Sequence, residues 1–163
     1  MQLTYNQTPN VAMAGMKADA SDDTCDSLAN GDTVTIPPGV AVIKGTSDAK
    51  AKLPGTSGDH FLGVTVYSAA GMTDLVNGGY AVADAMPVMR KGRIWVQVEE
   101  AVNKGDNAFI RYASGTGTQK GAFRKSADTS TAVQAKGFVY LTTASANGFA
   151  LLEVDVSAHL TTF

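Results

Sequence analysis

The residue types that could do chemistry gather in one stretch of the sequence, residues 91–112. There the pair Glu99–Glu100 stands between the only tryptophan, Trp95, and Arg111. Two carboxylates whose surroundings push their pKa values apart can serve as a general acid and a general base. Adjacent residues of a strand point to opposite faces, however, so this pair cannot easily face one substrate. A solvated strand end is therefore the favoured interpretation of Glu99–Glu100.

Other kinds of chemistry find even less support in the sequence. Nucleophilic catalysis needs a base beside a serine or cysteine, and the histidines are His60 in a loop and His159 near the last residue. The acidic run 19–26 has neither the mid-loop glycine nor the terminal glutamate of a calcium loop. We interpret that run as a solvated segment, with weak cation binding as the alternative. The sequence thus predicts no catalytic residue, no metal site and no cofactor.

The glycine-rich stretch 115–121 resembles a phosphate cradle at first sight. Its third glycine comes one residue too late for the dinucleotide pattern, and Lys120 precedes Gly121 where a P-loop needs Ser or Thr. No helix is expected to follow and present its N-terminus to an anion. We therefore expect a flexible surface loop here.

The elements that must position these residues are strands. The chain has 16 Val against 9 Leu and 12 Asp against 3 Glu, which favours pleated strands and turns over helices. Turn signals recur every 8–12 residues or so, which is typical of a sandwich or a barrel. We predict an all-β fold, a single antiparallel β-barrel or β-sandwich-like domain with an extended N-terminal arm. The expected strands span residues 33–36, 40–43, 61–67, 80–83, 87–89, 93–98, 108–112, 138–142 and 149–156.

Strict alternation marks residues 93–98 as the clearest of these strands. It places Ile94, Val96 and Val98 on a core face and Trp95, together with Arg93, on the opposite face. An exposed aromatic residue flanked by arginine is a good interface anchor. A second buried core face is the equally open alternative for Trp95.

Residues 1–30 differ from the rest, and we divide the chain into an extended, acidic N-terminal arm (1–30) and a β domain (31–163). Residues 1–26 carry a net charge of −3, whereas residues 90–125 carry +5, so the two could meet within one subunit or between subunits. The segment could also be a strand followed by a loop, and a short helix over 21–28 is a less favoured alternative. The whole chain has a net charge of −2 and few aromatics among its basic residues, which argues against specific nucleic-acid binding. No stretch approaches the roughly 20 apolar residues of a membrane span.

Several short sequence elements, in order, resemble those of one protein family. They are AGMKAD (14–19), IPPGVAV (36–42), FLGVTV (61–66), PVMRKGRIWVQV (87–98), AVNKGD (101–106) and GAFR (121–124). Together they resemble the bacteriophage structural cement proteins, also called head decoration proteins. The resemblance covers most of the chain.

This resemblance implies a structural role without catalysis or cofactor. Such proteins oligomerise, often as trimers, on the outer surface of the virion capsid and bridge neighbouring major capsid proteins after assembly in the host cytoplasm. The interface candidates are Val11, Met13, Met16, Trp95, Arg93, Arg111 and Arg124. The alternatives are another β-rich virion component, such as a tail or baseplate module, and a small β-barrel ligand-binding protein. The role of Cys25, the single cysteine, stays open.

Overall fold

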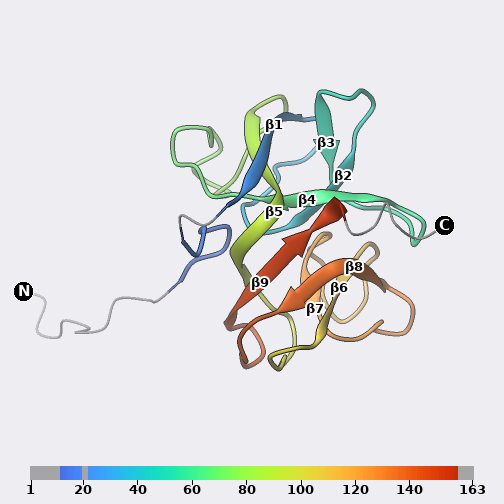
Figure 1. Ribbon diagram of the computed structural model, residues 1–163. Helices are drawn as coiled ribbons and strands as arrows, with labels where there is room; N and C mark the ends of the chain where they lie inside the picture. The colour runs from blue at the N-terminus through green and yellow to red at the C-terminus, as the bar shows by residue number, and fades with distance from the viewer. Residues whose placement is uncertain (1–11, 20–21, 158–163) are drawn as a thin grey trace, which may run out of the picture.

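A computed structural model of the chain describes residues 12–19 and 22–157, and within these ranges it is built from strands without an α-helix. The all-β prediction is therefore confirmed (Figure 1). The described residues also contain no helix that could span a bilayer. The strands are β1 (Thr24–Asn30), β2 (Ala41–Lys44), β3 (Lys50–Lys52), β4 (Phe61–Thr65), β5 (Ala85–Gln97), β6 (Asn107–Arg111), β7 (Phe123–Arg124), β8 (Ala132–Tyr140) and β9 (Phe149–Asp155).

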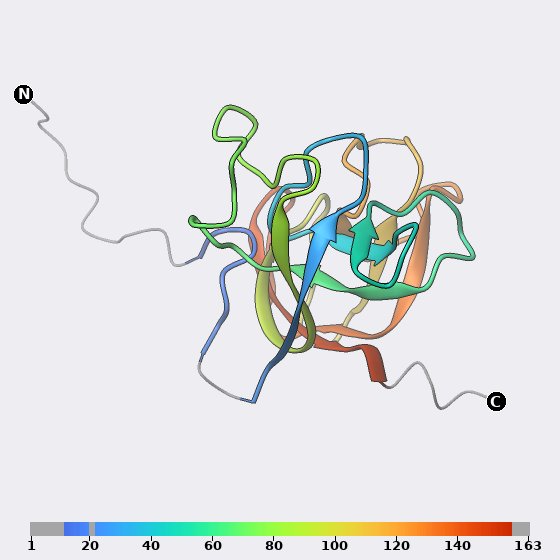
Figure 2. The same ribbon diagram turned by 90° about the horizontal axis from the view of Figure 1, so that it is seen from above.

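The strands form one strongly curved sheet in the order β1-β3-β2-β4-β5-β9-β8-β6-β7. Because β1 pairs with β5 as well as with β3, the first five strands of this order close into a barrel. The remaining strands β9, β8, β6 and β7 continue from β5 and form the second half of the sheet. This half lies below the barrel in Figure 1, and Figure 2 shows the molecule from above. The pairing of β1 with β3 is parallel, whereas the other strand ladders are antiparallel as predicted.

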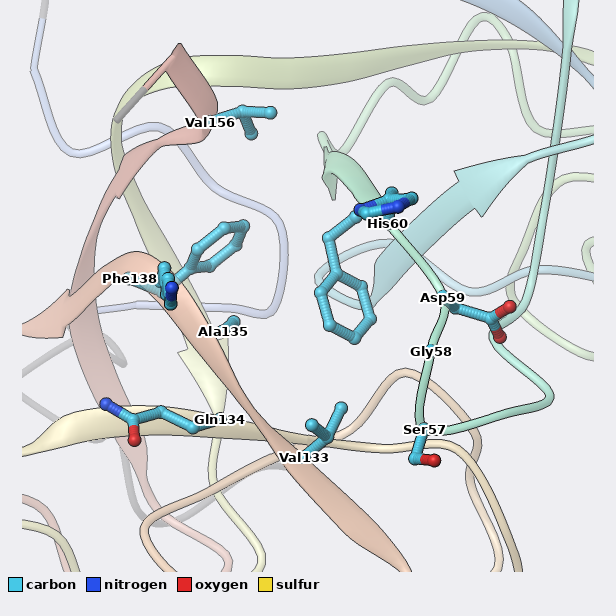
Figure 3. Close-up of a pocket in the computed structure, with 11 residues that line it drawn as sticks. Ser57, Gly58, Asp59, His60, Val133, Gln134, Ala135, Phe138 and Val156 are labelled. Carbon is cyan, nitrogen blue, oxygen red and sulfur yellow. The ribbon is translucent and has the colours of Figure 1, made fainter. Parts of the chain in front are cut away.

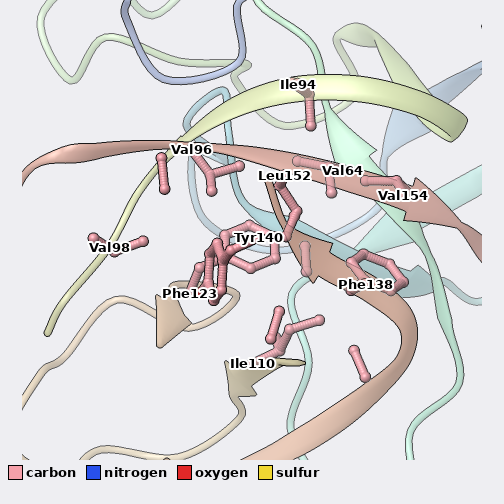
Figure 4. Packing of buried hydrophobic residues seen from close by; sticks show 14 of the residues in the cluster. Val64, Ile94, Val96, Val98, Ile110, Phe123, Phe138, Tyr140, Leu152 and Val154 are labelled. Carbon is pink, nitrogen blue, oxygen red and sulfur yellow. The ribbon is translucent and has the colours of Figure 1, made fainter. Parts of the chain in front are cut away.

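Strand β5 is long enough to serve both halves. Its Met86 and Val88 pack in the barrel core, whereas Ile94 and Val96 pack in the core of the second half. Between them, Gly92 lies just past the last β1 partner on β5 and has a φ of 137°, a conformation that side chains rarely adopt. Figure 4 shows Ile94, Val96 and Val98 beside Leu152, Tyr140 and Phe123 in this second core. The predicted core face of residues 93–98 is confirmed.

Strand boundaries differ from the predictions where the sequence has no clear periodicity. The expected strands 87–89 and 93–98 are parts of the single strand β5, and 33–36 and 80–83 contribute only an isolated bridge between Ile36 and Tyr80. Strands β3 and β7 were not predicted, because KAK and FR are too short to carry a pattern.

The expected arm also needs correction. Residues 24–30 form β1, which pairs with Ala85–Lys91 of β5 and is part of the barrel, so neither an arm nor a helix describes them. Its polar sequence gave no strand signal, and the open edges of β3 and β5 decide its conformation. Residues 1–11 lie outside the described residues, so an extended arm there stays a prediction.

Candidate interaction surface

The N-terminal segment (residues 12–19) lies against β5, where it acts as a short additional strand. The Gly15 N–H donates to the Trp95 carbonyl (2.8 Å), and the Trp95 N–H donates to the Met16 carbonyl (2.9 Å). The Ala18 N–H donates to the Arg93 carbonyl at 3.1 Å. The described part of the expected arm is therefore docked on its own β domain.

Close backbone packing holds this segment in place. A Cβ atom on Gly15 would lie 2.8 Å from both the Cβ of Pro38 and the backbone N of Tyr67, so only glycine fits there. The opposing turn is equally tight, because a Cβ on Gly39 would lie 2.6 Å from the Gly15 nitrogen. Two of the short elements noted in the sequence, AGMKAD and IPPGVAV, thus pack directly on one another.

Ion pairs add to this docking. Lys17 pairs with Asp23 at 2.6 Å, and the resulting hydrogen bond raises the pKa of Lys17. Farther along, Arg90 meets Asp26 at 3.3 Å. Arg93 also reaches a carboxylate oxygen of Asp19, at 3.9 Å. The acidic segment and part of the basic midsection therefore meet within one subunit, one of the two arrangements that the charge pattern left open.

Four of the interface candidates come together at this place. Met13 is 45% exposed, Arg93 is exposed, and Met16 and Trp95 are half-buried. Trp95 lies on the face of β5 opposite Ile94 and is neither a fully exposed anchor nor a core residue. Val11 lies outside the described residues. The interface role of these side chains stays a prediction.

The other two candidates, Arg111 and Arg124, lie inside the molecule. The Arg111 side chain is fully buried and binds both Glu99 (Nε to Oε1, 2.8 Å) and Asp128 (Nη2 to Oδ2, 2.7 Å). Arg124 lies 3.3 Å from Glu99, 3.3 Å from Glu100 and 3.0 Å from Asp128. We call these five residues the buried charge cluster. Its two guanidinium groups are committed to carboxylates of their own chain.

Three groups of the cluster, Arg111, Asp128 and Glu100, are held in their charged forms. The hydrogen bond to Glu99 raises the pKa of Arg111 further above its already high value. The hydrogen bond from Arg111 and that from the Thr116 backbone hold the pKa of Asp128 well below its usual range. Burial raises the pKa of Glu100, but hydrogen bonds from Ser126 and Lys125 outweigh it and leave a lowered value. Arg111, Asp128 and Glu100 are thus fixed charges near neutral pH.

The expectation that Glu99 and Glu100 face opposite ways is wrong. Strand β5 ends at Gln97, so the two glutamates follow it in a bend and alternation no longer applies. Both carboxylates converge on Arg124. They are occupied by arginine and backbone donors rather than directed at a solvent-filled site.

The glycine-rich stretch has a different reason for its glycines than phosphate binding. A Cβ on Gly117 would lie 2.2 Å from Oε1 of Glu99, and a Cβ on Gly115 would lie 2.5 Å from Oδ2 of Asp128. The glycines let the loop pass close to two carboxylates, which would repel a phosphate. The expected surface loop is present, and hydrogen bonds from Thr116 to Asp128 tie it to the buried charge cluster.

A hollow lies near His60, between the segment 57–60 and strand β8. Figure 3 shows the segment 57–60 on one side of this hollow and Val133, Ala135 and Phe138 on the other. The Phe61 and Phe138 rings meet edge to face, with centroids 6.4 Å apart. Within the described ranges no group of three or more His, Cys, Asp or Glu could hold a metal ion. His159 lies outside the described residues.

One surface feature escaped the sequence reasoning. Leu75 and Val76 are 79% and 95% exposed at the tip of the loop between β4 and β5. Two adjacent aliphatic residues inside the turn-rich stretch TDLVNGG were the available signal, because they fit neither a strand nor a polar turn.

Comparisons with known proteins agree with this architecture. A structural cement protein family (E217 gp24/Pam3 gp6) matches residues 1–155. A chain from the capsid of Myoviridae phage XM1 superposes with a TM-score of 0.75 at 15% identity, covering 95% of this chain and 97% of that one. The base of the head fibre gp8.5 of bacteriophage phi29 gives a TM-score of 0.41 at 12% identity over 82% of this chain and 96% of that one, too low to carry an argument. The search of curated proteins found no match. The chain belongs to the phage structural cement protein family.

Proposed function

We propose that this protein binds the outer surface of a phage capsid as an oligomer, a homotrimer, and stabilises contacts between major capsid proteins in the virion. Membership of the structural cement family supports this role. The observation that carries the proposal is the surface where the N-terminal segment docks on β5. It presents Met13, Trp95 and Arg93 at the point where the chain continues into residues 1–11.

Contacts within the chain bear on which residues we propose for the interface. Backbone hydrogen bonds from Gly15 and Ala18, and one to the Met16 carbonyl, hold the segment on its own chain. We expect residues 1–11, which include Val11, and the side chains of Met13, Trp95 and Arg93 to contact a neighbour. An extended peptide of this kind can cover much surface, because contacts formed on assembly offset the cost of ordering its backbone. We do not assign Arg111 or Arg124 a direct contact.

The test mixes the purified protein with undecorated shells of its phage and measures the number of copies bound per shell. We expect saturable binding of the full chain, at a stoichiometry that is a multiple of three per site. A chain that begins at Ala12 keeps the hydrogen bonds of Gly15 and Ala18 and should unfold at the same temperature. It should nevertheless bind at least about tenfold more weakly.

The capsid role and the contribution of residues 1–11 can be contradicted separately. An absence of saturable binding by the full chain would overturn the capsid role. Equal binding by the full chain and by the chain that begins at Ala12 would remove residues 1–11 from the interface and leave the capsid role intact. Detection of the labelled protein on tails rather than heads would favour the alternative role as a tail or baseplate component.

A further inference from the structure

The hollow beside His60 lies where the two hydrophobic cores meet. It consists of two adjoining cavities of about 510 Å³ and 230 Å³, which share His60, Phe61 and Val156, and we call them together the His60 groove. Phe61 packs against the core of the second half, whereas Leu28 and Leu62 of the larger cavity pack against the barrel core. These three side chains are only half-buried, so the groove leaves part of each core uncovered.

The groove is better suited to an apolar ligand than to a charged one. At its rim, Arg90 pairs with Asp26, and Asp48 pairs with Lys44. The Asp59 carboxylate accepts hydrogen bonds from two backbone N–H groups of its own loop. These charges are engaged within the chain, and the apolar surface between them gains free energy when an apolar group covers it.

The described chain ends at the wall of this groove. Strand β9 ends at Asp155, whose carboxylate accepts a hydrogen bond from the Ser157 N–H at 3.1 Å. Val156, between them, lines both cavities. Figure 3 shows Val156 and Phe138 on one side of the hollow and His60 on the other. The residues after Ser157 therefore begin beside the groove.

The sequence that follows has the chemistry to fill the groove. Residues 158–163 (AHLTTF) contain no Asp, Glu, Lys or Arg and include two large apolar residues, Leu160 and Phe163. An uncharged peptide enters an apolar hollow without the cost of burying a charge. An extended segment of this length spans about 20 Å, and cavities of this size enclose small organic ligands, so both length and volume suffice.

Covalent attachment favours these residues over a separate molecule. Their docking is intramolecular, so it avoids the loss of translational and rotational freedom that accompanies the binding of a second chain. The other end of the chain is less favourably placed, because the N-terminal segment lies on the side of the molecule opposite the end of β9 in both ribbon views (Figures 1 and 2).

We propose that residues 158–163 occupy the His60 groove of their own chain, anchored by Leu160 and Phe163. Docked there, the segment covers apolar side chains of both cores and ties the barrel to the second half of the sheet. The inference does not rest on the capsid role, and it is tested on the purified full chain without shells. A failure of one therefore leaves the other intact.

The first experiment measures how tightly an apolar fluorescent dye, anilinonaphthalene sulfonate, binds the groove. A segment that is docked in about nine chains of ten leaves one groove in ten open, so the full chain should bind the dye about tenfold more weakly than a chain ending at Ser157. Leu62→Ser in the shortened chain should remove this gain in affinity, because Leu62 lines the groove.

Two double variants of the full chain separate the anchors from the rest of the segment. Leu160→Ser/Phe163→Ser should bind the dye like the shortened chain, because both anchors are lost. Thr161→Ala/Thr162→Ala changes two residues of the same segment, keeps both anchors and should bind like the wild type. Cooperative thermal unfolding of each variant checks that the fold is retained.

The second experiment locates the segment by paramagnetic broadening of its resonances. In a Cys25→Ser background, Ser57→Cys carries a nitroxide label at an exposed position of the groove lining. This label should attenuate the methyl resonances of Leu160 in the same chain. Ala101→Cys carries the control label beyond the far end of the β5–β9 ladder, about 20 Å from Val156, and should attenuate them far less.

A mixture distinguishes docking within one chain from docking between two chains. Spin-labelled chains without isotope are mixed with isotope-labelled chains without a spin label, so any attenuation in the mixture comes from a neighbour. We expect attenuation within the chain that carries both labels and none in the mixture.

Three results would overturn the proposal. Equal dye affinities for the full and the shortened chain would show that residues 158–163 leave the groove open. Attenuation of Leu160 to the same degree by labels at positions 57 and 101 would place the segment elsewhere. Attenuation in the mixture as strong as that within one chain would make a neighbour's segment the occupant.

Discussion

The molecule contains two sets of ion pairs made from the same residue types, and they do different work. The buried charge cluster joins two arginines to three carboxylates in the second half of the sheet, with Arg111 fully buried. The pairs at the N-terminal segment, such as Lys17–Asp23 with its lysine side chain 41% exposed, lie in water. Because the buried charge cluster is shielded from water, its ion pairs are fixed, whereas solvent and salt weaken the exposed pairs at the N-terminal segment.

The difference concerns how each region is tied to the sheet. The loop after β6 is tied down through Thr116, which hydrogen-bonds with Arg111 and with Asp128 of the loop after β7. The N-terminal segment has backbone hydrogen bonds to β5 and the close Gly15–Gly39 packing, so its ion pairs are a minor addition. Four predictions test this comparison, from the largest expected effect to the smallest.

Arg111→Met should be the most damaging change. It would leave Glu99 and Asp128 without their main partner, and removal of one member of a buried pair costs about 3–5 kcal/mol. We expect the free energy of unfolding, measured by urea denaturation, to fall by that amount. Arg111→Lys should recover only part of it, because an ammonium group cannot reproduce the two-sided guanidinium contacts. A urea midpoint for Arg111→Met equal to that of the wild type would show that the buried charge cluster does not stabilise the fold.

Gly117→Ala should come next. Its Cβ would lie 2.2 Å from Oε1 of Glu99, so the loop or the glutamate must move. We expect a loss of about 1–3 kcal/mol in the same denaturation experiment, the usual cost of overpacking. Gly55→Ala is the matched control, because a Cβ there meets no atom within 4 Å. Equal stabilities for the two variants would contradict the steric reason for this glycine.

Acid should weaken the protein through Asp128. Its folded pKa is well below the unfolded value of about 3.9, so its stabilising contribution is complete above that value and is lost as the pH falls toward the folded pKa. The wild type should therefore lose more unfolding free energy than Asp128→Asn between about pH 5 and pH 2. Asp48→Asn removes the carboxylate of an exposed pair and should alter that slope less. Parallel slopes for wild type and Asp128→Asn would be the contrary result.

Lys17→Met should have the smallest effect. The pair with Asp23 is exposed, and such pairs contribute about 0.2–1 kcal/mol. We expect a shift of the thermal midpoint that disappears in roughly 1 M salt, where the screening length falls to a few ångströms. A loss as large as that of Arg111→Met would erase the distinction between the two regions.

The sequence predicted the features that depend on local pattern. Alternation over residues 93–98 identified the buried face of β5, and the valine and aspartate composition identified an all-β fold. It failed for β1, because TCDSLAN carries no alternating apolar face and is held as a strand by its neighbours on both sides. Short strands next to strong ones cannot be predicted from propensity alone.

For the candidate surface, the sequence supplied the residues but not their partners. Met16, Trp95 and Arg93 were named together, and the structure brings them together along one edge of β5. Arg111 and Arg124 were selected by charge alone, and charge does not reveal burial. The exposed pair Leu75 and Val76 was missed, because its exposure follows from the way the loop leaves the barrel and not from its residue types.

By itself, then, the sequence determined the strand periodicity, the turns and the family of this protein. Those properties depend on residues that are neighbours along the chain. Only the tertiary structure decided which charges pair, since Arg111 meets Glu99 and Asp128 through the curvature of the second half of the sheet, where Val98 bridges Phe123, and not through sequence spacing. The strand pairings likewise placed the loop between β4 and β5, which carries Leu75 and Val76, and the loop before β4 on opposite sides of the molecule, because the position of a loop on a curved sheet depends on every strand pairing between them.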